Sequence, residues 1–240
     1  MKYILLLVGA MLPSIVFGQI LQIHFDPRHT LDPKRNPENF PTIYFEYYKS
    51  NDSSGAFFIK TEADLQGADH NMGKFFTQVS KSFKFWKPKV YLQLQYSGGM
   101  GIAEPGSYGY YIANAFSTGL VYPFQWEGAW FSTSLLYTLN AFKKPSNDLM
   151  YSLYWGRGFW NYKVEFSGDI ELYTRNKNIG DASTANSHGK WLSFFGEPQV
   201  WFKVHKNFSL GSKINMYFHV ITDENLLQVY PTIAARFKFN

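Results

Sequence analysis

The segment from Asn161 to Thr174 (NYKVEFSGDIELYT) restricts the possible folds more than any other. Its apolar residues fall on even numbers, such as Val164 and Phe166, and its charged residues fall on odd numbers, such as Glu165. Because a β-strand turns successive side chains to opposite faces, this segment is predicted to be an amphipathic strand. In a soluble sandwich the apolar face would pack in a protein core. In a membrane barrel it would face lipid, and the charged face would line a water-filled interior.

The beginning of the chain indicates export. Residues 1–18 (MKYILLLVGAMLPSIVFG) contain a basic Lys2, an apolar run and small or β-branched residues ahead of Gln19, as signal peptides do. The apolar run is short for a membrane helix, and Pro13 interrupts it. We therefore expect a signal peptide over 1–18 and one domain over 19–240. Since this domain has no run of about 18 apolar residues, we expect any membrane insertion to use a barrel.

The composition agrees with an exported β protein. Aromatic residues make up 20% of the chain, charged residues only 17%, and there is no cysteine, which excludes disulfides and thiolate metal sites. The formal net charge of +5 is modest and no basic cluster stands out, so we expect no nucleic-acid partner.

Alternation of this kind recurs along the domain. It predicts an all-β fold, a transmembrane antiparallel up-and-down β-barrel of about 12 strands. The expected strands lie near residues 20–26, 42–49, 55–66, 74–86, 89–97, 112–122, 129–142, 148–157, 161–174, 190–204, 207–220 and 227–239.

The connections form a second pattern. Long polar loops and short turns alternate, as in outer-membrane barrels, and a soluble sandwich gives no reason for that parity. Aromatic residues that suit a membrane girdle, such as Trp86, Trp126 and Trp160, gather at the short turns. The long loops are expected at 26–41, 97–111 and 175–190, and the short turns at 86–89, 158–161 and 204–207.

Several stretches resemble a known family. The last segment, LLQVYPTIAARFKFN, is amphipathic and has the aromatic Phe239 just before Asn240, which resembles the insertion signal of outer-membrane barrels. The stretches SFKFWKP (82–88), YLQLQYSGG (91–99), YIANAFSTG (111–119) and FFGEPQVWFK (194–203) resemble a family of outer-membrane proteins similar to the Tsx-like nucleoside-specific channels. The resemblance implies a twelve-stranded barrel in the outer membrane that passes nucleosides or similar small solutes.

From these features we expect a monomeric outer-membrane channel that is surrounded by lipid and passes small solutes, nucleosides in particular, by passive diffusion. A barrel of this strand number suggests a narrow lumen. Two alternatives remain: a non-conducting scaffold or binding barrel that acts through its external loops, and a soluble secreted β protein.

The inward face supplies the candidate binding residues. Aromatic rings would stack on a flat base, while carboxylates and amides would hydrogen-bond ribose and base. The same charges could instead pair with one another and only stabilise a closed barrel. The candidates are Phe58, Lys60, Glu62, Asp64, Tyr91, Gln93, Lys163, Glu165, Asp169, Gln199, Trp201, Lys213, Asn215, Tyr217 and Arg236.

Nothing in the sequence favours an enzyme or a cofactor. No histidine pair has the spacing of metal ligands, and no constellation defines a catalytic site. The six histidines are scattered, at His24, His29, His70, His188, His205 and His219.

Three places resist the facing rule. In KFFTQVSKSFKFW the best phase turns Lys81 outward, so either a β-bulge shifts the register near residues 80–82 or Lys81 reaches out of the lipid. The two faces of 112–122 and of 148–157 differ too little to be assigned.

Overall fold

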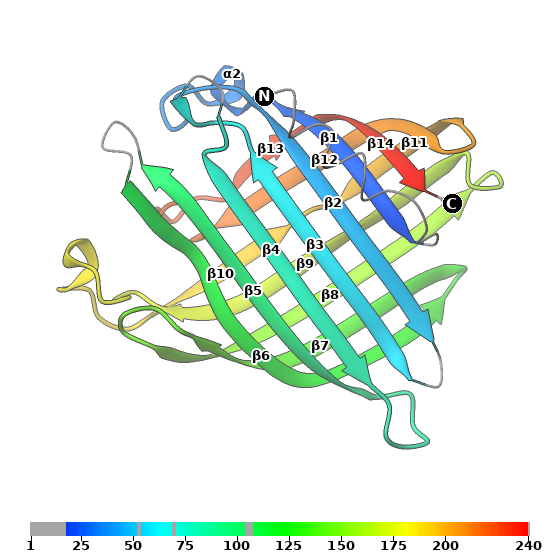
Figure 1. Cartoon of the computed structure of the whole chain (residues 1–240), viewed down its shortest axis with the longest axis horizontal. Helices are drawn as coiled ribbons and strands as arrows, with labels where there is room; N and C mark the ends of the chain where they lie inside the picture. Colours follow the sequence, from blue (N-terminus) through cyan, green and yellow to red (C-terminus); the bar gives the residue numbers. More distant parts are fainter. Residues whose placement is uncertain (1–17, 52–53, 69–70, 104–107, 240) are drawn as a thin grey trace, which may run out of the picture.

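The computed structural model describes residues 18–51, 54–68, 71–103 and 108–239, and its antiparallel strands close into a barrel (Figure 1). The predicted signal peptide therefore lies outside the described residues, except for Gly18. None of the helices in the described ranges is long and apolar enough to cross a membrane. The elements are β1 (Gln19–Asp26), α2 (Arg28–Leu31), β2 (Phe40–Asn51), β3 (Gly55–Asp64), β4 (Lys74–Phe83), β5 (Tyr91–Ala103), β6 (Tyr108–Trp126), β7 (Ala129–Asn140), β8 (Ser146–Phe159), β9 (Val164–Asn176), η2 (Ala182–Thr184), β10 (Lys190–Gly196), β11 (Gln199–His205), β12 (Phe208–Phe218), β13 (Gln228–Pro231) and β14 (Ile233–Phe239).

Each strand from β1 to β9 pairs with the next one in the chain, and β14 pairs with β1 to close the barrel. β10 and β11 share one place between β9 and β12, and β13 and β14 share another beside β12. The pairing register is the same before and after each break, since Gly196 opposes Ile170 and Gln199 opposes Ser167. The fourteen strands therefore make a twelve-stranded barrel, as the alternation predicted.

A proline lies at each break, Pro198 between β10 and β11 and Pro231 at the end of β13. Proline has no N–H, so it removes one hydrogen bond from the ladder without changing which residues face inward. The carbonyl of Pro198 still accepts from Ile214 N–H at 2.9 Å. The breaks are thus local losses of hydrogen bonds within continuous strands.

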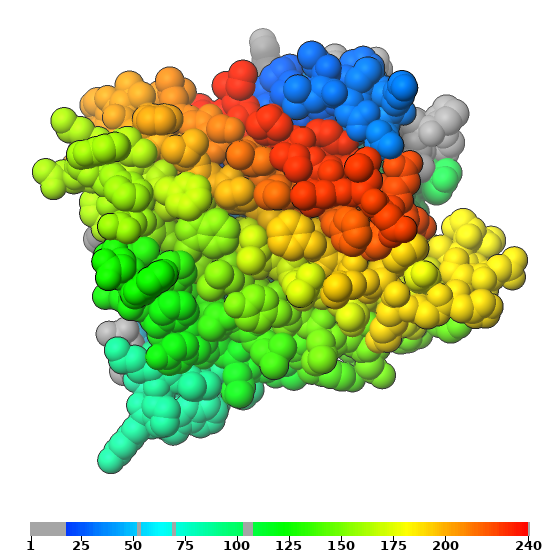
Figure 2. Space-filling model, turned by 180° about the vertical axis from the view of Figure 1, so that it is seen from behind, coloured from blue at the N-terminus to red at the C-terminus, as the bar shows by residue number. Residues whose placement is uncertain are grey.

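The two faces of strand β9 show which side of the barrel wall is apolar and which is charged. Phe166 and Leu172 point outward and are 44% and 41% exposed, whereas Asp169 is 7% exposed and lines an internal cavity. The apolar face is therefore the outside of the barrel and the charged face is the inside, the arrangement of a membrane barrel. Figure 2 shows part of this outer wall. Around the whole barrel, the exposed apolar side chains of the outer wall include Ile23, Ile43, Phe75, Leu94, Phe116, Leu120, Leu135, Leu149, Leu192, Phe202, Leu210 and Ile233.

The structure settles the three unassigned places. In β4, Ser80 and Ser82 line the internal cavity and the register with both neighbours is unbroken, so Lys81 faces outward without a bulge. It lies near the end of β4, with its Nζ 5.7 Å from the centre of the Phe83 ring. In β6 the buried inward residues include Ala115, Ser117 and Val121, and in β8 they include Asp148, Met150 and Ser152.

The long loops gather at one end of the barrel, with α2, and the short turns at the other (Figure 1). We call these the long-loop end and the short-turn end. The first strand residue, Gln19, pairs with Phe239, so β1 begins and β14 ends at the short-turn end. Trp86, Trp126 and Trp160 are exposed at the short turns, as predicted for a girdle.

One predicted loop is wrong. Residues 97–111 belong mostly to β5 and β6, which pair as far as Ala103 and Tyr108. The glycines there suggested a loop, but Gly101 leaves room for its cross-strand neighbour: a Cβ atom at Gly101 would lie 2.5 Å from the Tyr110 ring. Aromatic rings that cover glycines in this way stabilise a ladder.

Candidate functional site

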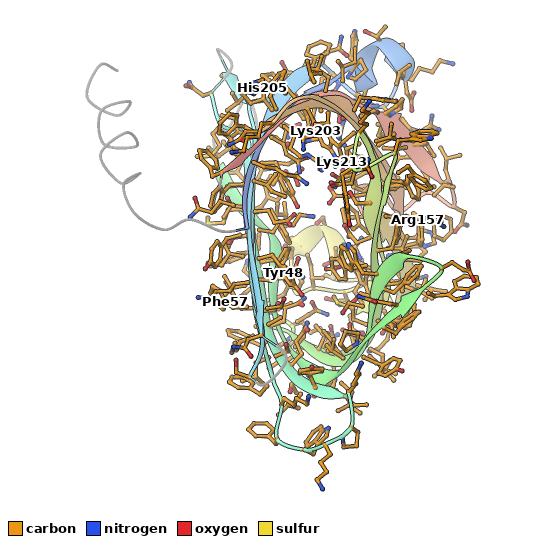
Figure 3. The ribbon with its side chains drawn as sticks, turned by 90° about the vertical axis from the view of Figure 1, so that its right-hand side faces the viewer. Tyr48, Phe57, Arg157, Lys203, His205 and Lys213 are labelled. Carbon is orange, nitrogen blue, oxygen red and sulfur yellow. The ribbon has the colours of Figure 1, made fainter. Side chains whose placement is uncertain are left out.

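The barrel is oval in cross-section when viewed along its axis, with Lys213 inside and Phe57 outside (Figure 3). Side chains from opposite walls consequently touch. The Phe58 ring on β3 and the Tyr154 ring on β8 meet edge to face, with their centres 6.3 Å apart. The lumen is the candidate site, and side chains cross it near the middle of the strands.

A cavity of about 530 Å³ occupies the half of the lumen nearer the short turns. This volume lies within the roughly 300–1,000 Å³ typical of small-molecule sites. Aromatic rings and neutral polar groups dominate its wall. Of the predicted lining residues, Phe58, Lys60, Gln93, Glu165, Asp169, Gln199 and Arg236 line it.

Other predicted residues lie on the inward side but outside this cavity: Glu62, Asp64, Tyr91, Trp201, Lys213, Asn215 and Tyr217. Lys163 is a correction. It lies exposed in the turn between β8 and β9, because Trp160, Asn161 and Tyr162 adopt positive φ angles of 49°, 55° and 59° and the strand begins only at Val164.

Several cavity residues are not among the predicted ones, including Tyr44, Gln95, Tyr154 and Trp155. Tyr154 and Trp155 lie in the segment 148–157, whose faces alternation could not separate. Tyr44 is in phase with Glu46 on β2, and that alternation was the signal that could have identified it. Its hydroxyl donates to Glu46 at 2.9 Å.

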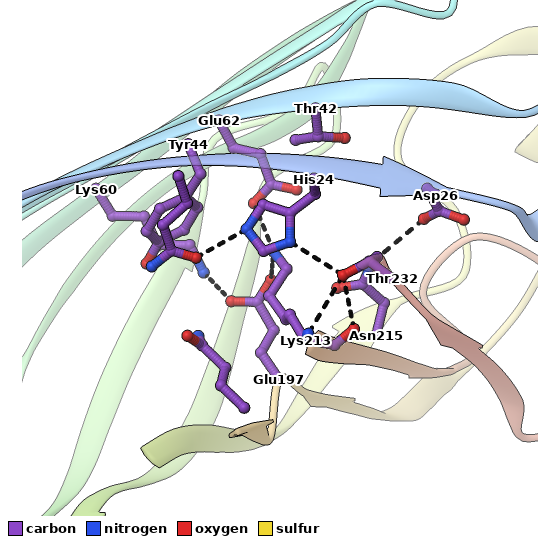
Figure 4. Close-up of polar contacts among 12 residues, drawn as sticks. His24, Asp26, Thr42, Tyr44, Lys60, Glu62, Glu197, Lys213, Asn215 and Thr232 are labelled. Atoms are coloured by element: carbon purple, nitrogen blue, oxygen red, sulfur yellow. Dashed lines mark hydrogen bonds and ion pairs between the residues drawn. The ribbon is translucent and has the colours of Figure 1, made fainter. Parts of the chain in front are cut away.

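Four charged residues form a cluster across the lumen, at the inner end of the cavity (Figure 4). Glu197 accepts a hydrogen bond from Lys213 Nζ at 2.5 Å and a second one from Lys60 on the opposite wall. Lys213 Nζ also lies 3.6 Å from a carboxylate oxygen of Glu62. We call Lys60, Glu62, Glu197 and Lys213 the Glu197 cluster. The two positive and two negative formal charges of the cluster cancel. A protein interior can hold charged groups when they are paired in this way.

Glu197 lies in the break between β10 and β11, where a backbone hydrogen bond holds it in place. Its backbone N–H donates to Asp169 O at 2.9 Å, so the residue remains in register although Pro198 follows it. Its side chain is 1% exposed. On the same inward face, Trp201 donates from Nε1 to Gln199 at 2.9 Å.

His24 borders the Glu197 cluster. One ring nitrogen is 2.7 Å from Gln22 Oε1 and the other is 3.0 Å from Thr232 Oγ1. The imidazole also meets the Trp201 ring edge to face at 6.1 Å. Both nitrogens thus hydrogen-bond neighbours within the barrel wall, which gives His24 a structural role here.

The loop 27–39 folds over the other half of the lumen. Arg28 of α2 donates to Asp26 at 2.6 Å, and its guanidinium lies 4.7 Å from the Phe40 ring centre and 5.0 Å from that of Tyr230. Asn36 donates to the Tyr230 hydroxyl at 3.1 Å. These contacts tie the loop to the inner wall at the long-loop end.

A surface ion pair joins the same loop to the connection between β12 and β13. Arg35 donates to Glu224, with Nη2 and Oε2 2.9 Å apart. The hydrogen bond and the charge of Glu224 raise the pKa of Arg35 above its usual value. Since this pair is exposed, we expect it to orient the loop rather than to stabilise the fold.

A second group of three charged residues lies at the short-turn side of the cavity. Glu165 accepts from Arg236 at 2.6 Å and from Lys238 at 2.8 Å. In both groups, charged side chains inside the barrel pair with one another, as the alternative interpretation of the sequence predicted. The wall of the cavity still offers amides, hydroxyls and aromatic rings that can bind a neutral solute.

Within the described residues, no group of three or more His, Asp and Glu side chains could hold a metal ion. His29 hydrogen-bonds the Asn36 carbonyl at 2.6 Å within its loop, and His219 hydrogen-bonds Asn225 at 2.8 Å. His70 lies outside the described residues.

Comparison with protein families gives a match over residues 18–239 to a family described as "Domain of unknown function (DUF5020)". The chain belongs to this family. Its domain therefore covers the whole barrel. No curated protein sequence matches the chain.

Solved structures show the same fold. The chain is similar to the NanC porin with a TM-score of 0.54 and 9% identity, over 92% of this chain and 100% of that one. It is similar to the KdgM porin with a TM-score of 0.50 and 8% identity, over 92% and 99%. At such identities the likeness concerns the fold. The predicted twelve-stranded barrel is confirmed, and the predicted outer-membrane location agrees with this fold and with the apolar outer wall.

Proposed function

We propose that the protein is an outer-membrane channel through which small polar solutes, nucleosides among them, diffuse passively. The observation that carries the proposal is the cavity of about 530 Å³ inside a closed barrel with an apolar exterior. Its wall combines flat aromatic rings with amides and hydroxyls. A nucleoside has the matching parts, because the base can stack and the ribose can exchange hydrogen bonds.

Phe58 is the best-placed stacking residue. Its ring faces the cavity and reaches toward Tyr154 on the opposite wall. Stacking of a base on an aromatic side chain contributes about 1–3 kcal/mol. A base that passes between the two walls would have to displace this ring contact, which makes the Phe58 position sensitive to the shape of the solute.

Liposome swelling tests the proposal. Vesicles that contain the purified barrel should swell faster in uridine than in a sugar of the same size. Phe58→Leu should reduce that preference, whereas the adjacent outward change Phe57→Leu should leave it intact. Equal swelling rates for uridine and the sugar would remove the nucleosides from the proposal and leave a general channel.

A non-conducting binding barrel is the second candidate. The Glu197 cluster favours it, because its paired charges cross the lumen, and so does Arg28, which packs against the inner wall at the long-loop end. Planar bilayers separate the two candidates. Discrete current steps support the channel, and their absence from folded, inserted barrels supports the binding barrel, which would act through its long loops.

A further inference from the structure

The charges of the lumen are arranged unevenly around one carboxylate. Within the Glu197 cluster, Glu197 is in contact with both lysines, while Glu62 is 3.6 Å from Lys213 alone. Lys60 comes from β3 and Lys213 from β12, so the two cations approach from different walls (Figure 4). A single carboxylate therefore contacts both converging positive charges, and Glu62 supplies the second negative charge of the cluster.

The cluster lies where it can act on a passing ion. Lys60 and the neighbouring Asp169 line the cavity, so its inner end is formed by these charges. Both ammonium groups also lie near the Tyr44 ring, with Lys60 Nζ at 5.4 Å and Lys213 Nζ at 5.1 Å from its centre. This ring restricts where the lysines can move. Any ion that crosses the middle of the barrel passes within a Debye length, about 10 Å at 0.1 M salt, of the cluster.

We propose that Glu197 determines the charge selectivity of the pore at this level. The inference rests on the proposed channel function and specifies which residue controls it. With Glu197 ionised, the two positive and two negative charges of the cluster cancel. Loss of that one charge leaves an excess positive charge in a confined space of low dielectric, where charged side chains select among ions.

The test is the reversal potential of the purified full-length barrel in planar bilayers under a KCl gradient. Glu197→Gln removes one negative charge from the cluster and should raise the chloride-to-potassium permeability ratio by about threefold or more. Lys213→Gln removes one positive charge and should lower the ratio. Glu165→Gln, at the short-turn side of the cavity, makes the same charge change as Glu197→Gln. It should shift the permeability ratio clearly less.

The outcomes are distinct. If wild-type barrels that are folded by heat-modifiable gel migration carry no current, the channel function itself is wrong. If they conduct but Glu197→Gln and Glu165→Gln shift the ratio equally, or neither shifts it, the assignment of selectivity to Glu197 is overturned. Should Glu197→Gln fail to fold, Lys60→Gln and Lys213→Gln decide the matter, because the proposal requires a shift toward potassium in both.

Discussion

A positive charge on the outer wall should destabilise the barrel according to its depth in the membrane. Leu135 lies in the middle of β7, is 58% exposed and pairs with the outward residues Leu120 and Tyr151. Arginine at the midplane of a barrel's lipid face costs about 2–4 kcal/mol, and near the interface about 0–1 kcal/mol. We expect Leu135→Arg to lower the free energy of unfolding by the first amount.

Leu139 is the matched control on the same strand and face. It lies four residues toward the long-loop end, and with a rise of about 3.4 Å per residue and a tilt of about 40° this is roughly 10 Å along the barrel axis. An apolar band about 25 Å tall then ends close to it. Leu139→Arg should therefore cost about 1 kcal/mol or less.

The measurement is equilibrium unfolding by guanidinium in phospholipid vesicles, followed by tryptophan fluorescence. A loss at Leu135 that exceeds the loss at Leu139 by about 1–3 kcal/mol fits a membrane-spanning wall. Equal losses, or a variant Leu135→Arg as stable as the wild type, would show that this face does not meet lipid and would refute the reasoning.

Three further predictions concern the interior. Glu165→Leu should lower the free energy of unfolding by roughly 3–5 kcal/mol, because Arg236 stays buried without this partner, and adding Arg236→Met should restore most of the loss in the same unfolding assay. Arg28→Ala should free the loop 27–39 from the wall, which limited trypsin digestion of vesicles should detect as faster cleavage there; an unchanged pattern would contradict it. Gly119→Ala should impair heat-modifiable folding, since a Cβ atom would lie 2.1 Å from a backbone oxygen of β7, whereas Gly109→Ala, with its nearest atom at 3.6 Å, should fold normally.

Alternation predicted the barrel because facing depends only on the parity of a residue within its strand. It holds across the break at Pro198, and so the inward facing of Gln199 and Trp201 follows from the sequence. Parity failed at Lys163, where the left-handed residues of the turn delay the start of β9. Alternation gave no assignment in 112–122, because the inward residue Ala115 is small and differs little in hydrophobicity from the outward face.

The contacts across the lumen could not be predicted. Lys60 and Glu197 are 137 residues apart, and alternation says only that both point inward. Which charges meet depends on how far the oval barrel is flattened and on the depth of each residue. Both properties arise from the packing of all twelve strands together, so pairing of the charges remained an open alternative until the structure resolved it.

The pairing of Gln19 with Phe239 has a consequence for biogenesis. The seam joins β1 and β14, the first and last of the described strands, so a product that lacks β14 cannot finish the circle. A polypeptide halted before β14 would present β1 and the part of β12 that pairs with β14 as open edges, whose N–H and C=O groups lack partners in lipid. Premature termination should thus yield aggregates or substrates for proteolysis instead of smaller pores.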